Sequence, residues 1–185
     1  MTSSLEALQR LLAERSARRG KFTLSSGRES TLYIDARLTT MSPEGLALIG
    51  TLGLDALRQS GWDVRSVGGL TLGADPVAYA IAYASVQQPP MIRAFTVRKE
   101  AKTHGTGQLI EGPFTAGDRV AIVEDVITTG ASALKASTAV QSAGGVVAGV
   151  LAVVDREEGG REALLDQGFP VIALTRAGEI TRHMP

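Results

Sequence analysis

One short stretch limits what this chain can fold into: RVAIVEDVITTGASALKAS, from Arg119 to Ser137. It begins with the apolar run VAIV, continues with the acidic pair Glu124 and Asp125, and passes through TTGAS into a segment with helical character. A strand that is apolar on both faces is typical of a parallel sheet with helices on both sides. The stretch therefore predicts a strand, a polar turn and a helix within an α/β fold.

The rest of the chain repeats this alternation. Strands are expected at VRSVGGL, MIRAFTVR, VVAGVLAVVD and PVIALT, and helices at GADPVAYAIAYASV, GASALKASTAVQSAGG and GREALLDQG. A leucine-striped first helix would take Ser3 or Ser4 as its N-cap, and a second helix would run from Pro43 to about Arg58. Between them, KFTLSSGRESTLYIDAR predicts two short strands around a loop. We expect a single domain, residues 1–185, with a doubly wound, mostly parallel sheet flanked by helices.

Composition argues against several classes of function. Lys plus Arg and Asp plus Glu are balanced at 19 each, so no overall field draws the chain to nucleic acid or to anionic lipid. With no cysteine and two distant histidines, a metal in this chain would use the oxygen ligands that suit magnesium. No apolar run approaches the roughly 20 residues of a membrane span, and the first residues lack a signal-peptide core. We expect a cytoplasmic protein with no membrane partner.

The turn after VAIV has the composition of a site for a sugar phosphate. Backbone N–H groups at a helix N-terminus bind phosphate, and Thr128, Thr129 and Ser132 add hydroxyl donors beside Gly130. The carboxylates of Glu124 and Asp125 would repel a phosphate, but they can accept hydrogen bonds from the vicinal hydroxyls of a ribose. An acidic pair at a strand end followed by an ordinary helix cap explains the same letters about equally well.

VAIVEDVITTGAS as a whole resembles the phosphoribosyl-pyrophosphate (PRPP) signature of type I phosphoribosyltransferases. The resemblance implies that fold, and it implies that Glu124 and Asp125 hold the ribose hydroxyls, with Asp125 also among the catalytic residues. It assigns the 5′-phosphate to the segment from Asp125 to Ser132, which continues through Val126, Ile127, Thr128, Thr129, Gly130 and Ala131. The implied cofactor is Mg²⁺, held mainly by PRPP and water rather than by a cluster of protein ligands.

The segment VRKEAKTHGTG concentrates cations in a chain without net charge: Arg98, Lys99, Lys102 and His104. A solvated basic loop is the plain interpretation. Next to a PRPP site, however, such donors would stabilise the charge that develops on departing pyrophosphate. The glycines after His104 would let the loop open and close over the site. His104 can change its charge near neutral pH and is a candidate general acid.

RKEAKTHGTG resembles the catalytic loop of orotate phosphoribosyltransferases. The resemblance implies a homodimer in which Arg98, Lys102 and His104 act in the neighbouring subunit's site and Lys99 acts in its own. In VVDREEGG, Arg156 matches the arginine that binds the orotate carboxylate, and Thr128 would contact the same base. The implied reaction joins N1 of orotate to the phosphoribosyl group of PRPP, giving orotidine 5′-monophosphate for pyrimidine biosynthesis.

Two further segments resemble this family, with departures. GKFTLSSGRESTLYIDAR is similar to its small N-terminal hood, and VGGLTLGADPVA to its pyrophosphate loop. Some members have lysine at Ser25 and an aromatic–lysine pair at Thr71 and Leu72, which puts pyrophosphate contacts from those positions in doubt. Transfer to a purine base, or PRPP sensing without catalysis, are the alternatives that the sequence leaves open.

Overall fold

The computed structural model describes residues 2–23, 29–100 and 108–185. The described strands are β1 (Ala17–Thr23), β2 (Glu29–Ile34), β3 (Ser66–Leu70), β4 (Arg93–Val97), β5 (Ile110–Glu111), β6 (Arg119–Ile127), β7 (Val146–Asp155) and β8 (Val171–Arg176). The described helices are α1 (Thr2–Arg15), α2 (Arg37–Thr40), α3 (Pro43–Gln59), α4 (Ala74–Gln87), α5 (Ala131–Ser142), α6 (Gly160–Asp166) and α7 (Ala177–Thr181). None of these helices is both long enough and apolar enough to cross a lipid bilayer.

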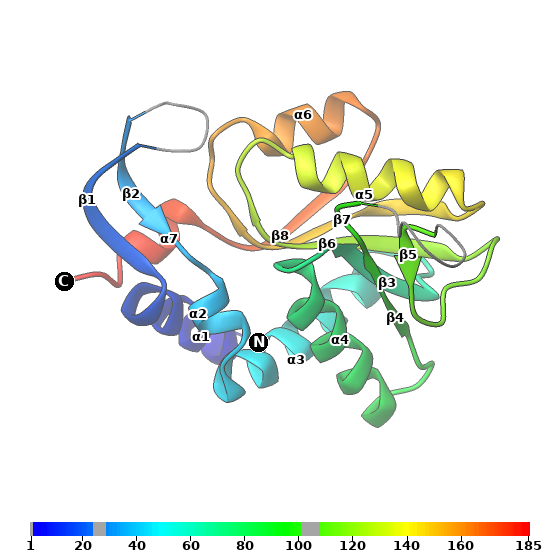
Figure 1. The fold of residues 1–185 in the computed structure, drawn as a ribbon. Helices are drawn as coiled ribbons and strands as arrows, with labels where there is room; N and C mark the ends of the chain where they lie inside the picture. The colour runs from blue at the N-terminus through cyan, green and yellow to red at the C-terminus, as the bar shows by residue number, and fades with distance from the viewer. Residues whose placement is uncertain (1, 24–28, 101–107) are drawn as a thin grey trace.

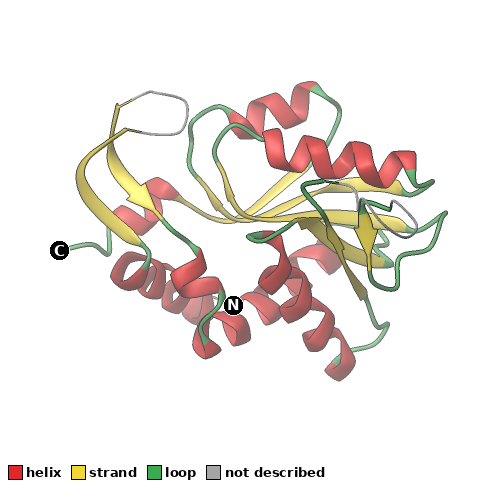
Figure 2. Ribbon diagram, in the orientation of Figure 1, coloured by secondary structure: helices red, strands yellow, loops and turns green. Residues whose placement is uncertain are grey.

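Six strands form one sheet in the order β5-β4-β3-β6-β7-β8 (Figure 1). Neighbouring strands are parallel except for β5, which runs antiparallel to β4. Helices α5 and α6 lie on one face of the sheet, and α3 and α4 lie on the other (Figure 2). Residues 120–123 of β6 have no exposed surface, as expected for a strand covered on both faces. The prediction of a mostly parallel α/β sheet flanked by helices is confirmed.

Local sequence signals explain some element ends and fail at others. Helix α3 begins at Pro43 because the Ser42 hydroxyl accepts a hydrogen bond from the N–H of Gly45 at 3.1 Å. The N-cap prediction for α1 is wrong, since this helix begins at Thr2 and both Ser3 and Ser4 lie within its first turn. Ser3 and Ser4 are helical because α1, whose leucine stripe is buried further along, extends back to Thr2.

Strand boundaries differ from the prediction where long-range pairing extends them. Strand β6 continues beyond the acidic pair to Ile127, because β7 pairs with it as far as Ile127 opposite Asp155. Strand β1 begins at Ala17, before the predicted start, because Ala17 pairs with Ile34 of β2. These two strands form a small separate sheet, the hood, which stands beside the main sheet in Figure 1. The short elements α2, β5 and α7 have no periodic signal in the sequence.

The order of the strands decides where a ligand can bind. From β3 the chain crosses to β4 on one side, and it later returns to β6 on the other side of β3. Connections therefore diverge at the carboxyl ends of β3 and β6, which leaves a crevice there. The acidic pair of β6 and the loop after Leu70 of β3 lie at this position.

Candidate active site

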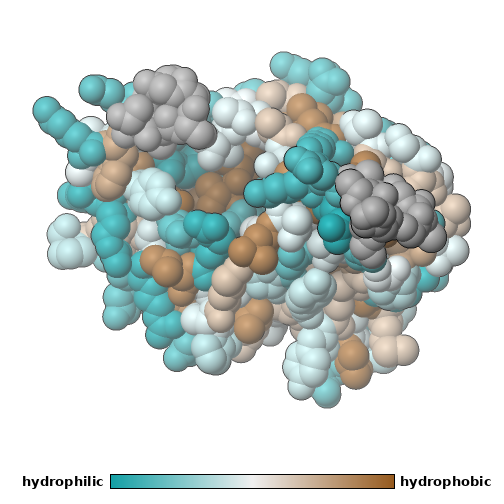
Figure 3. Space-filling model, in the orientation of Figure 1, coloured by the Kyte–Doolittle hydropathy of each residue, from teal (hydrophilic) through white to brown (hydrophobic). Residues whose placement is uncertain are grey.

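A cleft of about 530 Å³ lies at the carboxyl ends of β3 and β6, on the side of the hood. Figure 3 shows this surface hollowed between the hood and the rest of the molecule. Five parts of the chain line the cleft: residues 33–37, residues 70–73, Lys99, the end of β6 with the following turn (Glu124, Asp125, Val126, Thr128, Thr129 and Ser132), and Arg156 after β7. The fold thus brings together the acidic pair, the phosphate turn, Arg156 and Lys99, which are far apart in the sequence.

The turn before α5 leaves its helix N-terminus open to a ligand. Gly130 is the N-cap residue with φ 78°, a conformation that favours glycine, and no side chain caps the helix. A smaller pocket of about 200 Å³ is lined by Glu124 and by residues 126–133, which include Ile127 and Ala131. Uncapped N–H groups at the start of a 12-residue helix form a binding site for a phosphate group.

Gly160 supports this turn from behind, a contact that the sequence did not predict. A Cβ atom at Gly160 would lie 2.6 Å from the Thr128 carbonyl oxygen and 2.8 Å from the Gly130 nitrogen. Only glycine therefore lets the start of α6 pack directly against the phosphate turn. The single hint in the sequence is the glycine pair that follows β7, and such a pair marks turns in general.

Glu124 is a buried carboxyl group whose ionised form lacks stabilising neighbours. It is 6% exposed, and its Oε1 atom has no hydrogen-bond partner within the part of the chain that the structure describes. Burial, and secondly the charge of Asp125, raise the pKa of Glu124 to about 8. A buried acceptor without a donor is costly. This carboxyl group is therefore ready to accept hydrogen bonds from a ligand with hydroxyl groups.

Asp125 completes the acidic pair on the next residue of β6. Burial raises the pKa of Asp125, while hydrogen bonding from the Val126 N–H opposes that shift. The N–H lies 2.9 Å from Asp125 Oδ1. A Cβ atom at Gly73 would collide with the Asp125 carboxylate, so the loop after β3 packs closely against this side chain.

Arg156 lies at the end of β7 and joins the hood to the main sheet. Its Nη2 atom donates to the Leu32 carbonyl oxygen at 2.9 Å and to Glu158 Oε1 at 2.6 Å. The side chain is buried, and its Nε atom has no partner among the described residues. A guanidinium group held in this way can present its remaining donors to a planar carboxylate.

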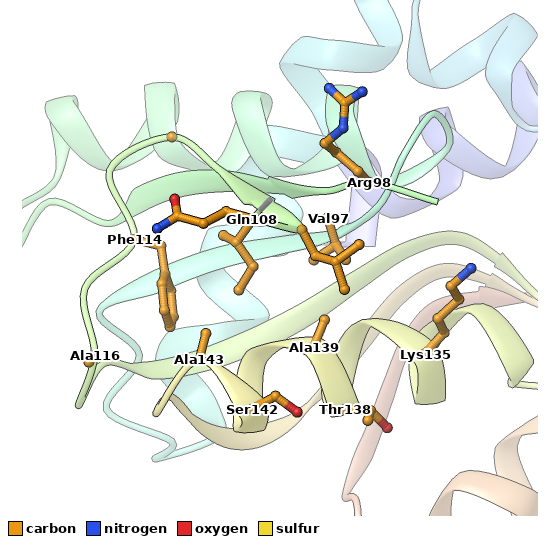
Figure 4. A pocket seen from close by; sticks show the side chains of 13 residues that line it. Val97, Arg98, Gln108, Phe114, Ala116, Lys135, Thr138, Ala139, Ser142 and Ala143 are labelled. Carbon is orange, nitrogen blue, oxygen red and sulfur yellow. The ribbon is translucent and has the colours of Figure 1, made fainter. Parts of the chain in front are cut away.

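The described part of the cationic segment divides between two places. Lys99 lines the cleft, whereas Arg98 forms an ion pair with Glu111, with 3.6 Å between Nη1 and Oε1. Arg98 borders a separate cavity of about 750 Å³ between α5 and residues 97–98 and 108–116, and its guanidinium points away from α5 in Figure 4. This larger cavity contains neither acidic residue of β6. Lys102, His104 and Ser25 lie outside the described residues.

Asp35 and Arg37 are further residues of the cleft that the sequence did not identify. Arg37 donates from Nε to Asp35 Oδ1 at 2.8 Å and from Nη2 to Oδ2 at 2.9 Å. Hydrogen bonding from Arg37 lowers the pKa of Asp35. Arg37, paired with Asp35, lines the same cleft as Thr71, Leu72 and Gly73.

Comparison with known proteins identifies the chain. No family model matches it. The orotate phosphoribosyltransferase of Aquifex aeolicus (strain VF5) is 48% identical over 178 residues, covering 95% of this chain and 96% of that protein. The orotate phosphoribosyltransferase of Mycobacterium avium (strain 104) is 52% identical over 166 residues, covering 90% of each. A crystal structure of Mycobacterium tuberculosis H37Rv orotate phosphoribosyltransferase in complex with PRPP matches with a TM-score of 0.81 and 43% identity, over 96% of this chain and 99% of that one.

The fold and the cleft are those of a phosphoribosyltransferase, an enzyme of the pentosyltransferase class. With relatives of this identity and coverage, the chain belongs to the orotate phosphoribosyltransferase family.

Proposed function

We propose that the cleft binds PRPP along the end of β6 and orotate beside Arg156. N1 of orotate then displaces pyrophosphate at C1′ of the ribose, and orotidine 5′-monophosphate forms. The observation that carries the proposal is that one cleft contains the acidic pair of buried Glu124 and half-buried Asp125, the turn before an uncapped helix N-terminus, and the buried Arg156. These three features match the diol, the phosphate and the carboxylate of the two substrates.

The end of β6 and the turn after it would bind the ribose 5′-phosphate part of PRPP. Glu124 and Asp125 accept hydrogen bonds from the ribose hydroxyls, and the turn from Val126 to Ser132 surrounds the 5′-phosphate. As the bond to pyrophosphate breaks, the ribose becomes cationic, and the nearby carboxylates stabilise that charge. Thr128 would contact the orotate ring, and its position in the lining of both pockets supports this role.

A second set of residues would bind pyrophosphate, the leaving group of the reaction. Thr71, Leu72 and Gly73 form one wall of the cleft, which Arg37 and Lys99 also line. Cations at this wall favour pyrophosphate, the most highly charged part of PRPP. Lys102 and His104 would add further donors, and His104 would protonate the departing pyrophosphate.

Mg²⁺ is the proposed cofactor. Within the described residues, no group of three His, Cys, Asp or Glu side chains could hold a metal ion. These residues fit a magnesium ion that would be held mainly by the oxygens of PRPP and by water. Glu124 and Asp125 would bind the ribose hydroxyls rather than the metal. When bound, the ion would neutralise charge on pyrophosphate.

We also propose a homodimer that shares its cationic segment, and a cytoplasmic location, where soluble nucleotide precursors are available. Arg98 borders the separate cavity and pairs with Glu111 instead of lining its own cleft, which supports a role in the neighbouring site. Large apolar side chains are exposed on and just after α4: Tyr79, Tyr83, Val86 and Met91. Such a patch favours a protein partner, here a second copy of the chain.

Complementation between two inactive variants tests the shared segment. Lys102→Ala removes a loop cation and Glu124→Gln removes a carboxylate, so each variant alone should be nearly inactive. Mixed after dissociation and reassociation, they should regain about a quarter of wild-type activity, because half of randomly formed dimers carry one complete site of two. A mixture that stays as inactive as its components would show that the loop serves its own subunit.

The test of the reaction is pyrophosphate release from PRPP and Mg²⁺ with orotate, uracil, adenine, xanthine or hypoxanthine offered separately. Release with orotate alone is expected. Release only with a purine would retain the PRPP site and overturn the orotate assignment. PRPP binding without release for any base would favour a sensor, and salt-dependent binding to nucleic acid would strengthen that alternative.

A further inference from the structure

A set of hydrogen-bonded side chains, centred on the buried Asp75, connects Thr71 of the loop 71–73 with Thr96 and Tyr79. The Thr71 hydroxyl donates to Asp75 Oδ2 at 2.7 Å, and the Thr96 hydroxyl donates to Asp75 Oδ1 at 2.8 Å. The Tyr79 hydroxyl lies 2.8 Å from Thr96 Oγ1. Since the Thr96 proton is directed at Asp75, Tyr79 must be the donor in this last bond. Asp75 is 9% exposed, so both oxygens of a buried carboxylate receive a donor.

Backbone hydrogen bonds hold the loop 71–73 in addition to the side-chain hydrogen bonds of Thr71 and Asp75. The Thr71 N–H donates to the Val97 carbonyl at 2.8 Å, and the Asp75 N–H lies 3.3 Å from the Leu72 carbonyl. Gly73 packs against the Asp125 carboxylate on the opposite side. Asp75 itself is in the first turn of α4, where a negative charge is favourable. The position of the loop relative to Asp125 therefore depends on Asp75.

The composition of the loop makes this position important. Thr71, Leu72 and Gly73 carry no charge, and the Thr71 hydroxyl proton is already directed at Asp75. Because the Thr71 N–H is bonded to Val97, the loop can offer an anion the backbone N–H groups of Leu72 and Gly73, and their contribution depends on their placement. A displacement of the loop would move these donors without changing their number.

We propose that Asp75 is a positioning residue that holds the loop 71–73, through Thr71, in place for the pyrophosphate group of PRPP. The inference rests on the proposed function, because it takes this wall as the pyrophosphate side of the cleft. Asp75 touches no substrate and acts only through Thr71. Tyr79 supports the same arrangement two hydrogen bonds further away, so Tyr79→Phe should have a smaller effect than a change at Thr71.

The test separates pyrophosphate binding from base binding. Thr71→Val keeps the shape and removes the hydroxyl, and Asp75→Asn keeps the size and removes the charge. Each should raise KM for PRPP and, in the reverse reaction, for pyrophosphate by about tenfold, the loss expected for one hydrogen bond to a charged group. KM for orotate and for orotidine 5′-monophosphate should change less than twofold. Thr71→Ser should restore the wild-type constants, and Thr138→Val, an exposed site on α5, is the matched control.

Calorimetric binding of PRPP with Mg²⁺, and the thermal midpoint, complete the design. A lower midpoint with unchanged constants for PRPP and pyrophosphate would reduce Asp75 to a structural residue and overturn the inference. An equal rise for all four ligands would do the same. PRPP binding by the wild type without turnover of orotate would count against the proposed reaction alone, since the effect of Thr71→Val on PRPP binding would still test the role of Asp75.

Discussion

Replacing Arg156 with alanine is expected to weaken orotate binding by about 100-fold or more, the loss typical of removing one partner of a buried charged pair. PRPP binding should change little, because the acidic pair and the phosphate turn belong to β6 and α5. The large loss of orotate binding is expected because Arg156 is buried and its Nε has no partner within the described residues. Calorimetric titration of the variant with orotate, and separately with PRPP and Mg²⁺, measures both effects.

Arg156 also has structural contacts, and the controls must account for them. The substitution removes a donor from the Leu32 carbonyl and from Glu158, so the hood and the end of β7 lose a connection. The double variant Arg156→Ala with Glu158→Ala should recover stability but not orotate binding. Uracil lacks the carboxylate, so the preference for orotate over uracil should nearly vanish in both variants. Equal losses for PRPP and orotate would instead indicate general damage to the cleft.

The β6–turn–α5 unit could be predicted from the sequence because its determinants are local. An apolar strand, two carboxylates, a glycine turn and a helix follow one another within a single stretch of chain, and each has its own signal. The same applies to the N-cap of α3 at Ser42. Arg156 was predicted from a family pattern, since one arginine after a strand has no meaning by itself.

The remaining walls of the cleft come from long-range packing. Asp35 and Arg37 reach the cleft only because the hood folds beside the sheet, and nothing in their neighbours marks them as functional. Gly160 is required by its distance from Thr128 and Gly130, and a distance between segments has no local sequence signal. Strand pairing likewise extends β6 to Ile127, opposite a β7 that is long enough to accept it.

Glu124→Gln is expected to lower kcat by about 100-fold, the effect typical of removing one group that stabilises charge in a transition state. The same change should stabilise the free protein at alkaline pH, because it replaces a buried carboxylate by a neutral amide of the same shape. Function and stability therefore place opposite demands on this residue. Turnover and the free energy of unfolding, measured on the same variant, test both statements.

The pH dependence follows from the raised pKa. Glu124 titrates near its ordinary pKa of 4.5 when unfolded and at about 8 when folded, so between these values the folded state binds more protons. The free energy of unfolding should thus fall as pH rises through this window, by up to about 1.4 kcal/mol per pH unit from this group. Glu124→Gln should remove that contribution, whereas Glu162→Gln, an exposed position on α6, should retain it.

Catalysis should show the opposite trend, because the carboxylate form is the one that stabilises a cationic ribose. For the wild type, kcat/KM for PRPP should rise with pH up to about 8, where the free enzyme loses the Glu124 proton. The Glu124→Gln profile should lack this rise, and the Glu162→Gln profile should keep it. If the rise persists in Glu124→Gln, another group controls the pH dependence of kcat/KM. If Glu124→Gln is less stable than the wild type above pH 8, neighbouring groups already stabilise the buried carboxylate in the free protein.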